Sequence, residues 1–110
     1  MEVYNSTSFT AENYCEEHLN VVVNRLIVPD KRKVAEEIIE HCRKNDFRNI
    51  FFSYDVVYPN KLKISVYLSK KDVRGGKEVF GFVYDTEQGE IGEYNFIENP
   101  EKFGVKIKEN

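Results

Sequence analysis

Hydrophobic and polar positions alternate from Asn49 to Ser69, which predicts two β-strands joined by a turn. The turn falls at Pro59-Asn60-Lys61. A slip of one residue would move every side chain to the other face, so burial favours an odd-length loop with Val56 opposite Ile64. This register gathers on one face Ile50, Phe52, Tyr54, Val56, Leu62, Ile64, Val66 and Leu68.

Apolar residues recur at helical spacing from Ala11 to Ile27. Thr10 is a suitable N-cap, and Glu12 lies in the first turn, where a carboxylate suits the helix dipole. The run Val21–Val23 is β-branched and would also fit a strand. The Glu-rich flanks and the length of the stretch favour a helix.

A second helix is predicted from Lys31 to Asn45. Pro29 disfavours helical geometry at Val28, and Asp30 can cap the helix that follows. The short connection between the two predicted helices implies that they are antiparallel neighbours. The apolar stripe of the second helix consists of Val34, Ala35, Ile38, Ile39 and Cys42.

The C-terminal half reads as a series of strands. Residues 70–77 are polar and glycine-rich, which indicates a loop. A third strand is predicted over Glu78–Tyr84 and a fourth over Glu90–Ile97, with a turn at residues 85–89 between them. Phe103–Lys108 is predicted as a short edge strand.

These elements predict one α+β domain over residues 1–110, in the order α-α-β-β-β-β. Sequential hairpins with short loops are the simplest connections, so the four strands should form an antiparallel meander. Both helices should pack on one face of this sheet. A β-rich alternative remains open if Val21–Val23 is a strand.

Composition places the chain among soluble globular proteins. It has 110 residues, of which 41% are hydrophobic and 32% charged, and its net charge is −3. No apolar run approaches the roughly 20 residues that span a bilayer, and the N-terminus lacks the pattern of a signal peptide. We therefore expect a cytoplasmic protein with no membrane association.

Two Cys and two His residues raise the question of a metal site. Cys15 and His18 are three apart, whereas His41 and Cys42 are adjacent, and adjacent helical residues point about 100° apart. Both cysteines fall at apolar positions, so we expect them to be reduced and buried, without a metal. Neither lies at a helix N-terminus, where a thiol would be activated. Asp55 interrupts a strand, with no second carboxylate on its face of the hairpin. We therefore expect no catalytic residue, metal or other cofactor.

Basic residues are concentrated in the middle of the chain, where residues 31–77 carry twelve basic and six acidic side chains. Basic groups beside an aromatic ring such as Tyr67 can bind nucleic acid. Lysine on a strand is also a common guard against edge aggregation. The candidate nucleic-acid residues are Lys61, Lys63, Lys70, Lys71, Arg74 and Lys77.

The face of the predicted sheet that the helices leave uncovered is unusually apolar. Exposed apolar patches of several hundred Å² often mark protein interfaces. We therefore expect a non-catalytic protein-interaction module, such as a regulator, accessory subunit or immunity-type inhibitor, that binds a protein partner or forms a homodimer. Nucleic-acid binding is the alternative, a small enzyme of unknown type ranks third, and Phe103–Lys108 folding back over the patch is the structural alternative. The interface candidates are Phe51, Val57, Tyr67, Val79, Val83 and Ile91.

Overall fold

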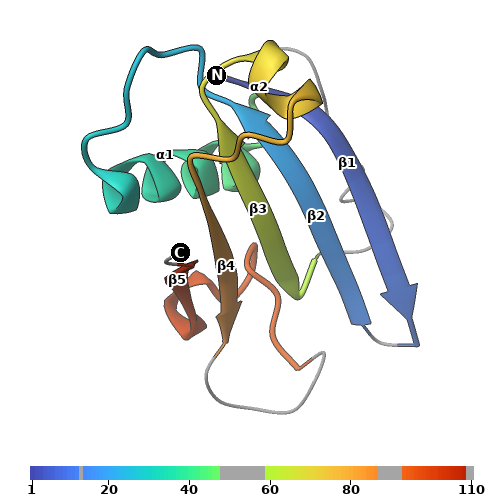
Figure 1. Cartoon of the computed structure of the whole chain (residues 1–110). Helices are drawn as coiled ribbons and strands as arrows, with labels where there is room; N and C mark the ends of the chain where they lie inside the picture. The colour runs from blue at the N-terminus through green and yellow to red at the C-terminus, as the bar shows by residue number, and fades with distance from the viewer. Residues whose placement is uncertain (13, 48–58, 87–92, 109–110) are drawn as a thin grey trace.

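The computed structural model describes residues 1–12, 14–47, 59–86 and 93–108 (Figure 1). These residues form a mixed five-stranded sheet with strand order β1-β2-β3-β4-β5. A single long helix, α1, packs against one face of the sheet. The elements in chain order are β1 (Glu2–Ala11), β2 (Tyr14–Val22), α1 (Lys31–Lys44), β3 (Lys61–Tyr67), α2 (Lys70–Arg74), β4 (Phe80–Thr86), the 3₁₀ helix η1 (Pro100–Lys102) and β5 (Phe103–Lys108).

The predicted α-α-β-β-β-β order is wrong, because the first predicted helix is strand β2. β2 pairs antiparallel with β1 from Glu2↔Val22 to Ala11↔Tyr14. The residues at positions 15, 19 and 21 are buried at 1%, 3% and 0% exposure, on the face toward α1. Val21–Val23 is β-branched, and such side chains fit a pleated surface better than a helix. The same apolar residues fit both helical spacing and the alternation of a strand. In the structure they follow the alternation of a strand.

The prediction of a helix after Asp30 is confirmed. The Asp30 side chain accepts a hydrogen bond from the Lys33 backbone N–H at 3.1 Å and caps α1. Asn45 ends the helix in the left-handed conformation with φ 55°, which Asn adopts more readily than most residues. The buried stripe is the predicted one: Val34, Ala35, Ile38, Ile39 and Cys42.

β3 occupies the centre of the sheet, and both its edges are paired. It runs parallel to β2, with Glu16↔Lys61 to Val22↔Tyr67, and antiparallel to β4. A parallel pair requires a crossover, and α1 supplies it. The predicted antiparallel meander is therefore wrong, and β3 has β2 and β4 as neighbours where the sequence predicted a hairpin with residues 50–57. Residues 48–58, including Val56, lie outside the described part of the chain.

The C-terminal elements differ from prediction in two places. Residues 70–74 form the short helix α2, capped by the Ser69 hydroxyl, where a loop was predicted. Within the described part of the predicted fourth strand, residues 93–97 are not a strand: they form a bend and irregular backbone that lead into a turn at Phe96. The predicted edge strand Phe103–Lys108 is confirmed as β5, which pairs with β4 and so does not fold back over the open face.

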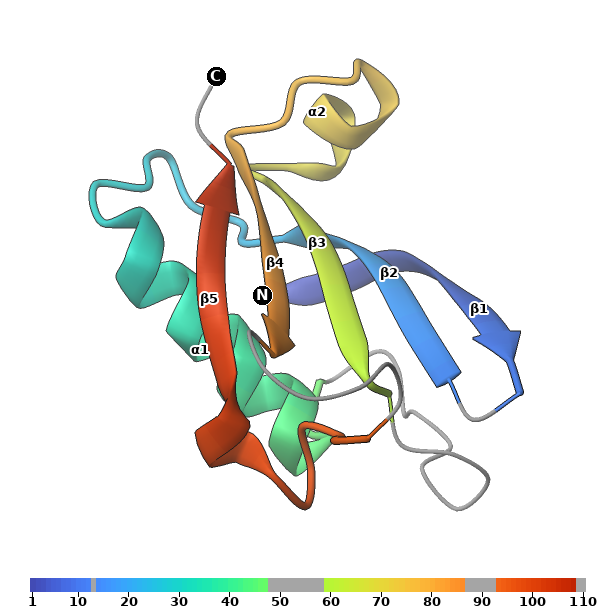
Figure 2. The same ribbon diagram turned by 90° about the horizontal axis from the view of Figure 1, so that it is seen from below.

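The core lies between the sheet and α1 (Figure 2). Ile38 of α1 and Phe82 of β4 are fully buried within it. The alternation predicted for β3 is confirmed, since Leu62, Ile64 and Val66 all enter this core. The other face of the sheet carries no long helix in the described ranges, and α2 packs against the β2 and β3 end of it.

Candidate functional site

The sheet face turned away from α1 is the candidate functional site, and we call it the open face. Side chains alternate along a strand, so the even-numbered positions of β2 turn to this face while Leu19 and Val21 turn to the core. Val22 also belongs to the open face, yet it is 0% exposed, because α2 packs over that end. Below α2 the face is polar, and β2 contributes Tyr14, Glu16, His18 and Asn20.

Three of these residues form a hydrogen-bonded network along β2. The Tyr14 hydroxyl donates to Glu16 Oε2 at 3.1 Å, and His18 Nε2 lies 2.7 Å from Glu16 Oε1. An ionised carboxylate only accepts, so Nε2 of His18 is the protonated ring nitrogen. The Phe9 ring packs against the His18 ring, with 4.6 Å between the centroids. Glu16 and Phe9 together fix the orientation of the imidazole.

The network changes the acidity of its members. Burial alone would raise the pKa of Glu16. The hydrogen bonds from His18 and Tyr14 and the charge of Lys61 outweigh burial, so the pKa of Glu16 lies below its ordinary value. Burial, helped by the Glu16 charge and hydrogen bond, raises the pKa of Tyr14 to about 12. At neutral pH the pair is therefore a carboxylate and a neutral phenol.

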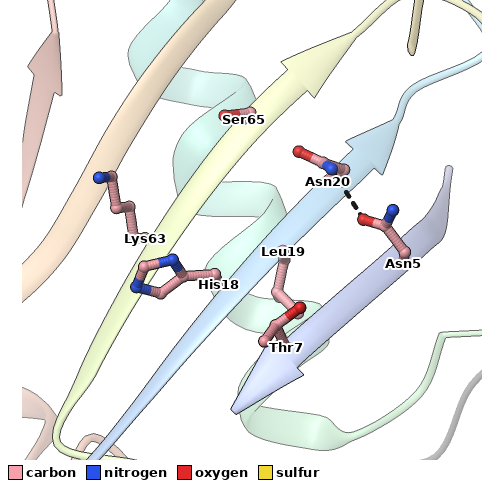
Figure 3. A pocket seen from close by; sticks show the side chains of 7 residues that line it. All are labelled: Asn5, Thr7, His18, Leu19, Asn20, Lys63 and Ser65. Atoms are coloured by element: carbon pink, nitrogen blue, oxygen red, sulfur yellow. Dashed lines mark hydrogen bonds between the residues drawn. The ribbon is translucent and has the colours of Figure 1, made fainter. Parts of the chain in front are cut away.

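A shallow pocket of about 210 Å³ lies beside His18, between β1, β2 and β3 (Figure 3). Asn20 Nδ2 donates to Asn5 Oδ1 at 2.7 Å along one wall. Lys63 projects from β3 next to His18, as the register between the strands requires. Nδ1 of His18 has no hydrogen-bond partner among the described residues, so it can accept from or donate to a ligand. The pocket lining comprises Asn5, Thr7, His18, Leu19, Asn20, Lys63 and Ser65.

Charge on the open face is arranged in rows that cross the strands. One row contains charges of both signs: Lys61 Nζ lies 3.9 Å from Asp85 Oδ2 and also lowers the pKa of Glu16. The next row contains no carboxylate, and we call it the basic row. It crosses all five strands and consists of Thr7, His18, Lys63, Val83 and Lys106.

The predicted interface patch is only partly within the described residues. Tyr67 and Val83 lie half-buried on the open face, and Val83 sits between Lys63 and Lys106 in the basic row. Val79 is half-buried and packs against the core cluster. The remaining candidates, Phe51, Val57 and Ile91, lie outside the described ranges, so the patch as a whole stays a prediction.

The residues of the predicted basic cluster differ in their surroundings. Lys61 pairs with Asp85, and Lys70 Nζ lies 3.4 Å from Glu2 Oε1. Lys63 points out from the middle of the open face. The other three candidates are exposed on α2 or just after it: Lys71, Arg74 and Lys77.

Cys15 and Cys42 are free thiols and are buried, as predicted, although Cys15 lies on a strand. Burial raises the pKa of both thiols. Among the described residues, no three Cys, His, Asp or Glu side chains gather in a group that could hold a metal ion. No helix in those ranges is both long and apolar enough to cross a membrane.

Sequence reasoning missed Glu16, His18, Asn5 and Asn20. A partial signal was present, because polar residues at even positions from 14 to 20 alternate with Cys15, Leu19 and Val21, and only Glu17 breaks the pattern. A period-two reading of this stretch would have placed Glu16, His18 and Asn20 on one face.

Comparison with known proteins gave no match: no family model, no curated protein and no solved structure matches this chain.

Proposed function

We propose that this protein is a non-catalytic binding module that docks an acidic segment of another protein on its open face. The observation that carries this proposal is the basic row, which crosses the sheet without a carboxylate. Lys63 is exposed and has no ion-pair partner among the described residues. A cation in this situation gains more from an acidic partner than one already paired in the free protein.

The apolar and polar groups around the row suit a protein partner. Val83 supplies a half-buried apolar surface between Lys63 and Lys106. Phe9 is 53% exposed at the β1 end of the open face. Interfaces of this kind combine an apolar centre and an aromatic group with a polar rim.

The hydrogen bonding of the open face favours binding over catalysis. A general base must lie within hydrogen-bond reach of the group whose proton it removes. Glu16 orients His18, and in the described part of the chain no hydroxyl or thiol hydrogen-bonds to the remaining ring nitrogen, Nδ1, where a nucleophile would lie. Both carboxylate oxygens of Glu16 already accept hydrogen bonds, one from Tyr14 and one from His18.

The test uses a fluorescent peptide of alternating Glu and Val, and a matched peptide in which Lys replaces Glu. We expect the acidic peptide to bind and its affinity to fall as salt increases, because exposed charges are screened. Lys63→Glu should weaken binding at least about tenfold, which is about 1.4 kcal/mol. Lys33→Glu on α1, on the far side of the sheet, is the matched control and should bind like the wild type.

Nucleic acid is the alternative ligand, and a single-stranded DNA arm of the same titration tests it. Binding through Lys71, Arg74 and Lys77 would be lost in a triple Ala variant and would fall steeply with salt. Tight DNA binding with no affinity for the acidic peptide would replace the proposal. Equal affinity for both peptides would refute it.

A further inference from the structure

The two edges of the sheet are built differently. β5, at one edge, has six residues and carries exposed Lys106 and Lys108. β1, at the other edge, has ten residues, and its one charged residue is Glu2, which pairs with Lys70 at 3.4 Å. Charged side chains, above all Lys, are a usual guard of edge strands against pairing with another chain. β5 carries this guard and β1 does not.

The outer edge of β1 is also regular. Its register with β2 shifts between Val3 and Asn5, and from Asn5↔Asn20 to Ala11↔Tyr14 it is continuous. This segment contains no Pro, Gly or charged residue. Within the part of the chain that the structure describes, no strand pairs with that edge. Its backbone N–H and C=O groups form a ready template for a further strand.

We infer that a second copy of this chain adds its own β1 to this edge, antiparallel, and joins the two sheets into one. A two-fold axis perpendicular to the sheet keeps both open faces on the same side. With the axis at Thr7, Thr7 pairs with its own counterpart and Asn5 faces Phe9 of the second copy. Thr–Thr pairs stabilise neighbouring strands.

Charge explains why the partner is a second copy. Charged residues make up 32% of the chain, so many ways of pairing two copies would set like charges against each other. A two-fold axis places each residue near the same residue of the other copy, where like charges directly opposite are destabilising. Residues 5–11 avoid this cost because none of them is charged. An uncharged strand also offers no charge by which to select a different acidic or basic partner.

Dimerisation would extend the pocket beside His18. Asn5 and Thr7 line that pocket and lie on β1. In the proposed register, Phe9 of the second copy stands opposite Asn5 and closes the outer wall of the pocket. The two basic rows then continue across the joined sheet through Thr7.

Sedimentation velocity over a range of protein concentrations tests the inference. The wild type should shift from the 13.0 kDa chain toward twice that mass as concentration increases. Thr7→Lys and Thr7→Glu should each remain monomeric, because each places like charges opposite one another. An equimolar mixture of the two variants should restore the dimer through opposite charges, which also shows that both variants fold. Thr7→Val is the matched uncharged control and should dimerise.

Other outcomes overturn the inference. A wild type that stays monomeric at the highest soluble concentration would show that the edge is not self-pairing. A dimer that survives Thr7→Lys but dissociates with Lys63→Glu would place self-association on the open face. Failure of the Thr7→Lys and Thr7→Glu mixture to associate would refute pairing at Thr7. The peptide titration with Lys63→Glu tests docking on the open face, and sedimentation of the Thr7 variants tests dimerisation at the edge. Either proposal can therefore be refuted without the other.

Discussion

At the scale of single residues, Glu16 links the parts of the open face. It accepts hydrogen bonds from Tyr14 and His18 and lies near the Lys61 ammonium. These groups favour its charged form, and its pKa is below the ordinary value although burial acts in the opposite direction. The side chain therefore contributes to stability when it is ionised.

We expect Glu16→Gln to lower the free energy of unfolding by about 0.5–1 kcal/mol at pH 7. A carboxyl with a depressed folded pKa stabilises the fold above its unfolded pKa, and this contribution is lost as pH falls through the folded pKa. The difference between the two proteins should thus shrink toward pH 3. Urea unfolding at both pH values measures it.

Glu12→Gln is the control for this measurement, because Glu12 is exposed and forms no ion pair within the described residues. It should change stability little at either pH. An effect of Glu16→Gln that stays the same at pH 3 and pH 7 would mean that the charge of Glu16 does not stabilise the network.

At the scale of elements, the local sequence pattern correctly predicted the helix and the strand that bury a single face. The stripe of α1 and the alternation of β3 are local, and both were predicted correctly. β2 satisfied two periods at once, and its choice of strand depends on pairing with β1 and with distant β3. The pocket was missed for the same reason, since His18 and Lys63 become neighbours only through that parallel pairing.

The capping of α1 gives a prediction at this scale. Asp30→Ala removes the side-chain acceptor of the Lys33 N–H, which leaves a donor of the first turn without its partner. We expect a loss of about 1 kcal/mol in the free energy of unfolding. Asp30→Ser retains a capping oxygen and should recover most of the loss. Thermal unfolding of both variants measures these losses. If Asp30→Ser loses as much stability as Asp30→Ala, the capping hydrogen bond does not stabilise the helix.

At the scale of the whole molecule, stability depends on the layer between α1 and the sheet. Ile38 and Phe82 are each 0% exposed, and β2, β3, β4 and α1 all contribute to the same cluster. Asn60 connects this layer to the C-terminal segment: its backbone N–H donates to the Cys15 carbonyl at 2.7 Å, and its side chain donates to the Tyr94 carbonyl at 2.8 Å. The loss of one core side chain should therefore lower the free energy of unfolding of the whole domain.

Ile38→Ala should lower the free energy of unfolding by about 2–5 kcal/mol, through lost burial and the cavity that remains. Glu36→Ala on the exposed side of the same helix should change it by less than about 0.5 kcal/mol. Guanidinium unfolding of both variants provides the comparison. A small effect of Ile38→Ala would show that α1 is not packed as described.

The parallel pairing of β2 with β3 constrains how the chain folds. Cys15 and Asn60 are joined by a hydrogen bond of 2.8 Å, yet they are 45 positions apart in the chain. Closing so long a loop costs conformational entropy before any contact repays it, whereas the β1–β2 hairpin closes over a few residues. During synthesis, β1, β2 and α1 emerge before β3 and β4, whose side chains complete the core. Until residues 61–86 leave the ribosome, the apolar side of α1 lacks these packing partners, and a chaperone that covers exposed apolar segments would engage the protein at this stage.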